Sequence, residues 1–256
     1  MAVITPETED DPQIYLLDPF FYPCCPSTTP DPASSAARLI KGLQANELTT
    51  SFLATALPPF LLHTAATRPG HVDNVLQTLK LLSNTSSLPL VEDWDSHPNA
   101  TFAETFSVTF PDDLNDAIRG PIEITEHHSY VAASLLGARA RSMGMLTTPD
   151  IVGSVAEGLG FPDEVLFHYE GDIAEIAIIG ACVQLLGGAS SLVKDQPDRF
   201  AKNKILAALD RIQSKENDVL IKFTKDHLQK EPLVDLSSAE IVTNLKEKGW
   251  HFIVDV

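Results

Sequence analysis

The stretch IRGPIEITEHHSYVAASLLGARARSMG, residues 118–144, predicts a buried helix and decides the fold. Proline at position 121 lacks an N–H, so we expect Gly120-Pro121 to interrupt or begin this helix. Apolar residues then recur in steps of 7, 4 and 3, the spacing of a buried helical stripe, and cations followed by a glycine close it. Polar side chains capable of chemistry are set into the stripe: Glu123, Glu126, His127, His128 and Tyr130.

Helix start and stop patterns recur on both sides of this stretch. Asp31-Pro32 is a cap followed by proline at the first helical position, and predicts a helix to about Ala45. Ser237-x-x-Glu240 is a capping box before the last helix. Residues 89–109 have no helical period and predict a long loop with a short β-like piece. The other expected helices are 48–66, 72–82, a region from 112 into the central stretch, 148–157, 162–186 (ended by Gly187-Gly188) and 195–229, where the pattern allows an interruption.

The number of capped helical segments and the lack of alternating strand patterns predict an all-α fold. Residues 31–256 are expected to form a single helical domain, a length sufficient for a sizeable core. Residues 1–30 are expected to be an N-terminal arm, which begins with an acidic segment. Its apolar part, YLLDPFFY at 15–22, is expected to dock on the domain, with a lid over a pocket as the functional alternative.

Composition excludes several classes of partner. Lys and Arg number 18 and Asp and Glu 35, a net charge of -17, which disfavours nucleic acids and anionic membrane surfaces. The longest apolar run, 173–186, is shorter than a membrane span, and the first 13 residues contain no apolar leader. The three cysteines form no spaced disulfide framework. We expect a cytoplasmic protein without membrane association.

The run SYVAASLLGARARSMG at 129–144, followed by Thr148-Pro-Asp-Ile151, resembles the core of the AhpD-like family of alkylhydroperoxidases and carboxymuconolactone decarboxylases. The resemblance extends to the helix expected over 172–186, and more weakly to Leu57-Pro-Pro-Phe60 with Arg68-Pro-Gly-His71. It implies an AhpD-like helical bundle. The family's motif is Cys-x-x-Cys-x-x-x-His on a helix.

This sequence departs from that motif at all three positions. The two cysteines of the motif fall on Ser129 and Ala132, and its histidine falls on Leu136. Thiol peroxidase chemistry requires a low-pKa thiolate, which neither serine nor alanine supplies. The resemblance therefore implies a shared fold without the peroxidase activity, and no residue of the family is assigned a role here.

Glu123 and His127 are four residues apart, so on one helix their side chains can meet on the same face. A carboxylate that orients an imidazole makes a general base usable near neutral pH, and His128 is a second candidate. Tyr130 and Ser134 follow on nearby faces and are candidates to bind developing negative charge. The alternative is an ordinary surface pair of little consequence.

A second polar stripe consists of Glu164, His168, Asp172 and Glu175, in steps of 4, 4 and 3. If its helix packs antiparallel to the central one, these side chains face the Glu123/His127 pair, as in helix bundles that bind paired iron or manganese. The Glu-x-x-His spacing of such sites is missing from both helices, so a solvated stripe is the favoured interpretation. We therefore expect no metal and no other cofactor.

Three other groups have simple structural interpretations. His63 and His71 flank Arg68-Pro-Gly70 and are expected to cap helix ends, and Cys182 is expected to be an inert core thiol. The group Asp93-x-Asp95-x-His97 offers at most weak binding of a hard cation.

These observations together predict a cofactor-independent enzyme that performs acid/base chemistry on a small, mainly apolar organic substrate, with secondary metabolism as one setting. The reaction would be an isomerisation, cyclisation, elimination or decarboxylation, catalysed by Glu123, His127, His128 and Tyr130. The substrate-binding candidates are Ser134, Glu126, His168 and Asp172. A non-catalytic binding or assembly protein and a metal-dependent oxidase are the alternatives, and self-association into a homo-oligomer is left open.

Overall fold

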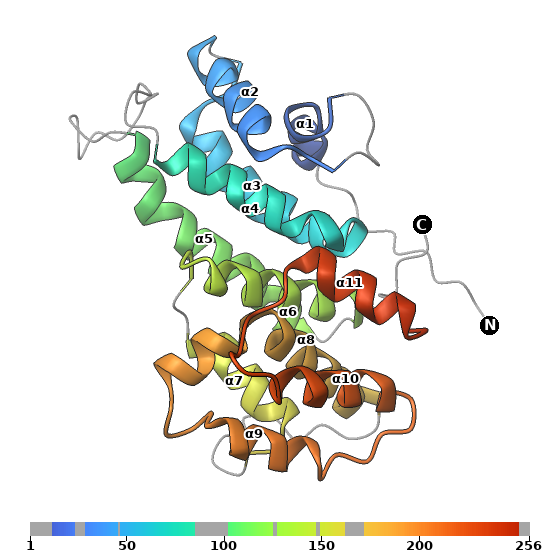
Figure 1. The fold of residues 1–256 in the computed structure, drawn as a ribbon. Coiled ribbons are helices and arrows are strands. Elements are labelled where there is room, and N and C mark those ends of the chain that lie inside the picture. Colours follow the sequence, from blue (N-terminus) through green and yellow to red (C-terminus); the bar gives the residue numbers. More distant parts are fainter. Residues whose placement is uncertain are drawn as a thin grey trace.

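The computed structural model describes residues 12–23, 29–45, 47–84, 102–124, 127–146, 149–161 and 172–250. Within these ranges the chain is helical and contains no strand, which confirms the predicted all-α class (Figure 1). The elements are α1 (Pro12–Phe21), α2 (Pro32–Gln44), α3 (Thr50–Thr67), η1 (Pro69–His71), α4 (Val72–Ser83), α5 (Phe102–Ile124), α6 (His127–Ser142), α7 (Pro149–Gly158), α8 (Asp172–Asp195), α9 (Lys202–Leu209), α10 (Asp218–Leu228) and α11 (Ser238–Glu247).

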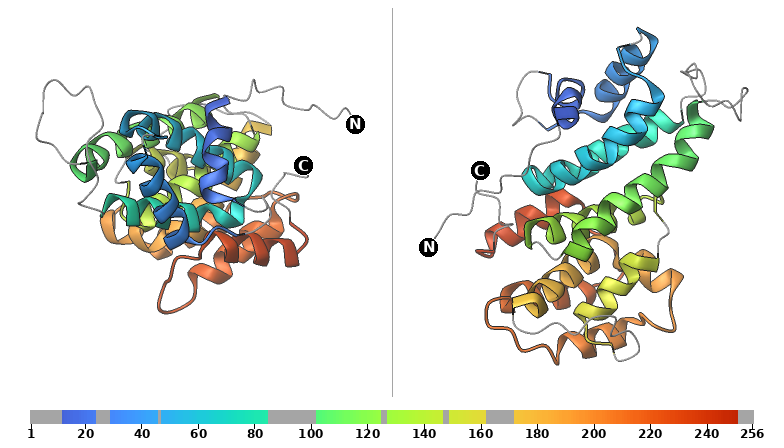
Figure 2. Two further views of the ribbon diagram at one scale, coloured as in Figure 1. Left: turned by 90° about the horizontal axis from the view of Figure 1, so that it is seen from above. Right: turned by 180° about the vertical axis from the view of Figure 1, so that it is seen from behind.

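The helices follow one another through the molecule from one end to the other. Figures 1 and 2 show α1 to α4 at one end, α5 and α6 in the middle, and α7 to α10 at the other end. The last helix, α11, returns to the middle and contacts η1, α4 and α8. Buried apolar side chains form a core cluster that runs from Leu17 in α1 to Leu245 in α11.

Several helix ends form where the sequence places a cap. The Asp31 carboxylate accepts a hydrogen bond from the Ser34 N–H at 2.8 Å, which begins α2 at Pro32 as predicted. The predicted capping box at α11 is also present, with reciprocal bonds between Ser237 and Glu240.

The apolar segment of the predicted N-terminal arm forms α1, which packs against α2 and α3. Leu17 and Phe21 are fully buried, and the Phe21 ring stacks on Phe60 with 4.8 Å between centroids. Arg68 adds an ion pair with Asp18 at 3.1 Å. Residues 1–11 and 24–28 of the arm lie outside the described ranges, and the division into residues 1–30 and 31–256 stays a prediction.

The prediction of a loop over 89–109 is wrong for residues 102–109, which belong to α5, whereas residues 85–101 are outside the described ranges. Phe106, Phe110, Leu114 and Ile118 recur every four residues and are buried, which gives α5 an apolar face. This packing also carries α5 through Gly120-Pro121, so the predicted break there is wrong. Proline removes one intrahelical hydrogen bond, and burial of the stripe offsets that loss.

The predicted stop at Gly187-Gly188 is confirmed as a break in α8. The backbone of Gly188 is not helical, with φ −157° and ψ 19°, and a second helical segment follows this kink to Asp195. The helix expected over 195–229 is interrupted, as the sequence allowed, and forms α9 and α10; its start differs from expectation, since Asp195 ends α8 and α9 begins at Lys202. The start of the helix predicted at 162 falls in residues 162–171, which are outside the described ranges.

Candidate functional site

The predicted site residues fall on three helices of the middle and lower parts of the molecule. Glu123 lies in α5, Tyr130 and Ser134 lie in α6, and the backbone of His127 and His128 begins α6. Asp172 is the first residue of α8. Of Glu123, His127, His128 and Asp172 only the backbone is described, and two further candidates lie outside the described residues altogether: Glu126 and His168.

Glu123 and His127 do not share a helix, contrary to the prediction. Helix α5 ends at Ile124, and α6 begins at His127. The expected contact rested on one continuous helix, in which residues four apart lie on the same face. Because Glu123 belongs to α5 and His127 to α6, that argument for the pair no longer holds.

Helices α6 and α8 run parallel to each other, so the condition for the two polar stripes to face each other, antiparallel packing, is not met. Gly180 of α8 lies against Tyr130 and Ser134 of α6, and Gly187 lies against Ala138 and Arg139. Residue numbers therefore increase in the same direction along both helices. The first residues of α6 and α8, which include His127 and Asp172, lie at the same end of this pair.

Helix α7 brings its C-terminal end to that same place. A Cβ added at Gly158 would lie 2.1 Å from the Ala177 carbonyl oxygen, so the two helices are in direct backbone contact near the start of α8. Further along, Gln184 Nε2 of α8 donates to Ser154 Oγ of α7 at 2.7 Å. These contacts show that α7 runs antiparallel to α8. The C-terminus of α7 therefore lies beside the N-termini of α6 and α8, and we call this region the shared end.

Tyr130 and Ser134 lie in the interior, 3% and 0% exposed. A Cβ at Gly180 would be 2.2 Å from Tyr130 Cε1 and 2.8 Å from Ser134 Oγ, so both side chains pack directly on the backbone of α8. The Ser134 hydroxyl has no hydrogen-bond partner among the described residues. Both residues are thus held rigidly between α6 and α8, one to two turns from the start of α6.

Other polar groups of α7 and α8 lie in the same interior without complete hydrogen bonding. Glu157 Oε1 and Gln184 Oε1 are buried and have no partner in the described part of the chain. Burial raises the pKa of the Glu157 carboxyl above its usual range, because the charged form loses hydration. Glu157 is one residue from the end of α7, so it lies near the shared end. No motif or spacing in the sequence singles out this carboxyl.

Glu175, expected in the stripe that faces the central helix, has a structural role instead. Its Oε2 accepts hydrogen bonds from Ser214 Oγ and Asn217 Nδ2, both at 2.6 Å, and so fixes the segment between α9 and α10. A carboxylate with these donors is turned toward that segment. Glu175 is therefore engaged away from the central helix, whereas Glu164 and His168 lie outside the described residues.

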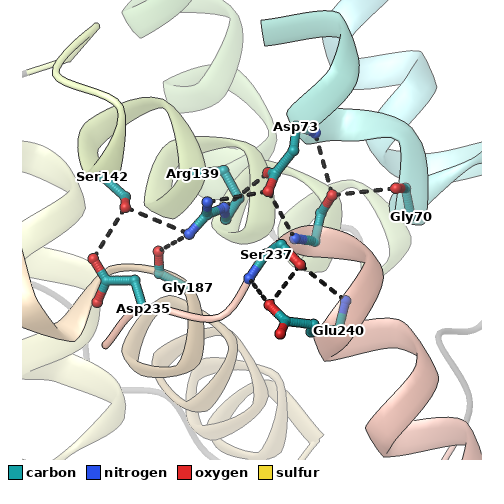
Figure 3. Close-up of polar contacts among 9 residues, drawn as sticks. Gly70, Asp73, Arg139, Ser142, Gly187, Asp235, Ser237 and Glu240 are labelled. Atoms are coloured by element: carbon teal, nitrogen blue, oxygen red, sulfur yellow. Dashed lines mark hydrogen bonds and ion pairs between the residues drawn. The ribbon is translucent and has the colours of Figure 1, made fainter. Parts of the chain in front are cut away.

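A second polar cluster, at the opposite end of α6, was not predicted (Figure 3). Arg139 donates to both carboxylate oxygens of Asp73 at 2.8 and 3.1 Å and to the Gly187 carbonyl at 2.8 Å. Asp235 accepts hydrogen bonds from Ser142 Oγ and from the Ser190 N–H and hydroxyl. The sequence indicated this cluster only through two arginines in an apolar helix, which were assigned to its dipole instead.

The remaining candidates from the sequence have these outcomes. Cys182 is fully buried, and burial raises its pKa to about 12, in agreement with the prediction of an inert thiol. His71 makes no side-chain cap, contrary to expectation, but packs its ring 5.8 Å from that of Tyr22. The group Asp93-x-Asp95-x-His97 is outside the described residues. No set of three or more His, Cys, Asp or Glu residues converges within the described ranges in a way that could hold a metal ion.

One helix, over Glu175–Asp195 in α8, is long and apolar enough to cross a membrane, with a mean hydropathy of 1.9. In this structure 72% of that segment is buried inside the molecule, as is usual for the core helix of a folded domain. Helix α8 contacts α6, α7, α10 and α11, which accounts for its apolar composition.

No family model, curated protein or solved structure shows significant similarity to this chain. The AhpD-like resemblance of residues 129–144 is therefore neither supported nor refuted and stays a prediction.

Proposed function

We propose that this chain is a cofactor-independent enzyme that performs proton-transfer chemistry on a small, mainly apolar molecule at the shared end of α6, α7 and α8. His127 and His128 would accept the proton. Glu157 replaces Glu123 as the carboxyl that we expect to take part.

The observation that supports this proposal is the parallel packing of α6 and α8. It brings the backbone of His127 and His128 to the same end of the molecule as the first turn of α8. The first N–H groups of a helix have no intrahelical acceptor, and the helix dipole makes this end partly positive. Two such ends side by side favour the negative charge that develops on a substrate when a C–H proton is removed.

Glu157, at the end of α7, supplies a candidate proton donor to complement the histidine bases. Because burial raises the pKa of its carboxyl, the group holds a proton closer to neutral pH than an exposed glutamate does. An isomerisation or elimination requires a base and an acid in one place, and the raised pKa makes the Glu157 carboxyl better suited to the role of acid than an exposed glutamate. Tyr130 and Ser134, buried behind the start of α6, would support the histidine-bearing turn by packing, rather than bind the substrate as the sequence predicts.

The close packing of the same helices supports an alternative, a binding or assembly protein without catalysis. At Gly158 and Gly180 the neighbouring helices approach so closely that an added Cβ would lie less than 3 Å from α8 or α6 atoms. Such contacts make a rigid bundle. A rigid helical scaffold suits the presentation of an outer surface to a partner.

Deuterium exchange distinguishes the two functions even while the substrate is unidentified. A library of small apolar carbonyl compounds would be incubated with the protein in D₂O, and deuterium uptake measured by mass spectrometry. The enzyme is expected to accelerate exchange in at least one compound, and His127→Ala/His128→Ala to abolish it. His71→Gln, which changes a histidine beside the opposite end of α6, is the matched control and should retain exchange. Exchange no faster than in buffer for every compound would favour the binding protein.

A further inference from the structure

Helix α6 carries two equally buried arginines, Arg139 and Arg141, each 7% exposed. Both reach α8 at its kink, where Arg139 Nη1 donates to the Gly187 carbonyl at 2.8 Å and Arg141 Nη2 to the Gly188 carbonyl at 3.2 Å. The hydrogen-bond partners of the two guanidinium groups can therefore be compared directly.

Arg139 has the partners that a buried guanidinium needs. Its Nε and Nη2 donate to the two carboxylate oxygens of Asp73, and its Nη1 donates to Gly187 (Figure 3). This two-point geometry between a guanidinium and a carboxylate is the strongest common form of a charged hydrogen bond. The charge of Arg139 is balanced where it lies.

Arg141 lacks the corresponding carboxylate. Its Nε and Nη1 are buried and have no hydrogen-bond partner in the described part of the chain. A buried charge without a partner is strongly unfavourable, and native proteins seldom contain one without an additional ligand. Burial also lowers the pKa of Arg141, an effect that the charges of Asp235 and Asp195 only oppose.

Neither nearby carboxylate serves as the missing partner. Asp235 accepts its three hydrogen bonds from Ser142 and Ser190 and none from Arg141, and Asp195 lies exposed at the end of α8. Gly188 leaves room for the guanidinium itself, because a Cβ there would lie 2.9 Å from Arg141 Nη2. The kink thus holds Arg141 through Nη2, while its Nε and Nη1 groups stay available as hydrogen-bond donors.

We propose that Arg141 binds a small carboxylate ligand, which would occupy the position that Asp73 occupies for Arg139. Burial of the guanidinium restricts the ligand to a small molecule. The negative charge of Asp235 beside Arg141 disfavours a doubly charged phosphate more than a singly charged carboxylate. The site lies about 21 Å along α6 from His127 at 1.5 Å per residue, so it is separate from the proposed shared end and does not depend on it.

Acetate is the probe for this site. The melting temperature of the dialysed full chain would be measured in sodium acetate, in sodium phosphate and in sodium chloride at equal ionic strength, because a ligand that binds only the folded state raises it. Acetate is expected to raise the melting temperature of the wild type in a concentration-dependent way relative to chloride. Phosphate stabilises folded proteins generally because it is excluded from their surfaces, so its effect should be the same in the wild type and in Arg141→Met. Arg141→Met should remove the acetate effect. Arg211→Met is the matched control, since it removes an exposed arginine, and should keep it.

A second measurement does not depend on the stability of a variant. The Arg141 Nε–H signal in the NMR spectrum, assigned by its loss in Arg141→Lys, should shift progressively as acetate is added, whereas the Arg139 Nε–H signal should not. A shift with phosphate but not acetate would overturn the assignment to carboxylates. Absence of any acetate effect on both the melting temperature and the Arg141 signal, or an unchanged effect in Arg141→Met, would overturn the site.

Discussion

Asp73 and Arg139 share two hydrogen bonds, of 2.8 and 3.1 Å, across the buried junction between α4 and α6. The same carboxylate accepts the backbone N–H of Ser238 at 3.2 Å, and the Ser238 hydroxyl accepts the N–H of Asp73 at 3.2 Å. One ion pair therefore connects three helices that are far apart in the sequence: α4, α6 and α11.

Removal of Asp73 should destabilise the protein strongly. In Asp73→Ala the guanidinium of Arg139 stays buried without its carboxylate, which costs about 3–5 kcal/mol. Asp210→Ala is the control, because Asp210 pairs with Lys225 on the surface, where an ion pair contributes at most about 1 kcal/mol. Urea unfolding measures both values, and a loss in Asp73→Ala no larger than in Asp210→Ala would contradict the role assigned to the pair.

Acid should destabilise the fold through His227, whose side chain is buried in the interior, 3% exposed. Burial lowers the pKa of His227 and the charge of Lys230 lowers it further; a hydrogen bond with the Val234 backbone and the charges of Asp235 and Glu240 oppose this shift without cancelling it. As pH falls below about 6.5 the unfolded imidazole gains a proton before the folded one. The contribution of His227 to the free energy of unfolding should therefore be constant in pH above that value and decrease below it.

Urea unfolding at about pH 7.5 and about pH 5.5 measures this slope. His227→Gln should reduce it but not remove it, since the pKa of His71 is also lowered, by burial and by the charge of Arg68. The double variant His71→Gln/His227→Gln should reduce the slope further. An unchanged slope in His227→Gln would show that His227 is protonated equally in both states.

Substitution of Gly180 should disturb the packing of α6 on α8. In Gly180→Ala the new Cβ meets Tyr130 Cε1 at 2.2 Å and Ser134 Oγ at 2.8 Å, and overpacking of this kind costs about 1–3 kcal/mol. Gly120→Ala in α5 is the control, because nothing lies within 4 Å of its Cβ. In Gly120→Ala the higher helix propensity of alanine stabilises the helix, whereas a methyl group before proline is sterically disfavoured in a helix. Because these effects oppose each other, we expect the free energy of unfolding to change by less than about 1 kcal/mol. Equal losses in thermal melts of both variants would argue against close packing at Gly180.

The capping box of α11 should contribute measurably to stability. Ser237→Ala removes the acceptor of the Glu240 N–H, a change that costs about 0.5–2 kcal/mol. Ser237→Asp is the control variant, since aspartate supplies an equivalent acceptor and should restore most of the loss. Chemical denaturation compares the three proteins, and a loss in Ser237→Asp equal to that in Ser237→Ala would contradict the capping role.

The sequence allowed prediction of those elements whose determinants are local. A helix cap such as Asp31 or Ser237 acts on an N–H three residues away, so its pattern is visible in the sequence. The start of α5 was not predicted, because the four-residue spacing of Phe106 and Phe110 stands among prolines and polar residues that are typical of a loop. Its passage through Gly120-Pro121 depends on burial against α3 and α6, which no local pattern shows.

The candidate site was less predictable, because it depends on the relative direction of helices. The pairing of Glu123 with His127 assumed one helix, and the opposition of the two stripes assumed antiparallel packing. The contacts of Gly180 and Gly187 with α6 set the direction of α8, and they involve residues about 50 positions apart in the sequence. For the same reason the pairing of Arg139 with Asp73, across 66 positions, was not foreseen.

The return of α11 to α4 has a consequence for the order of folding. The hydrogen bonds between Asp73 and Ser238 close a loop of 165 residues, and closure of so long a loop carries a large entropic penalty before any contact compensates it. Contacts of this span slow folding in proportion to their share of the native structure. During synthesis on the ribosome, α4 and α6 can form early, but the junction around Asp73 stays incomplete until residue 238 has been made. Helix α11 therefore completes a buried junction between α4 and α6, two helices that are synthesised long before it.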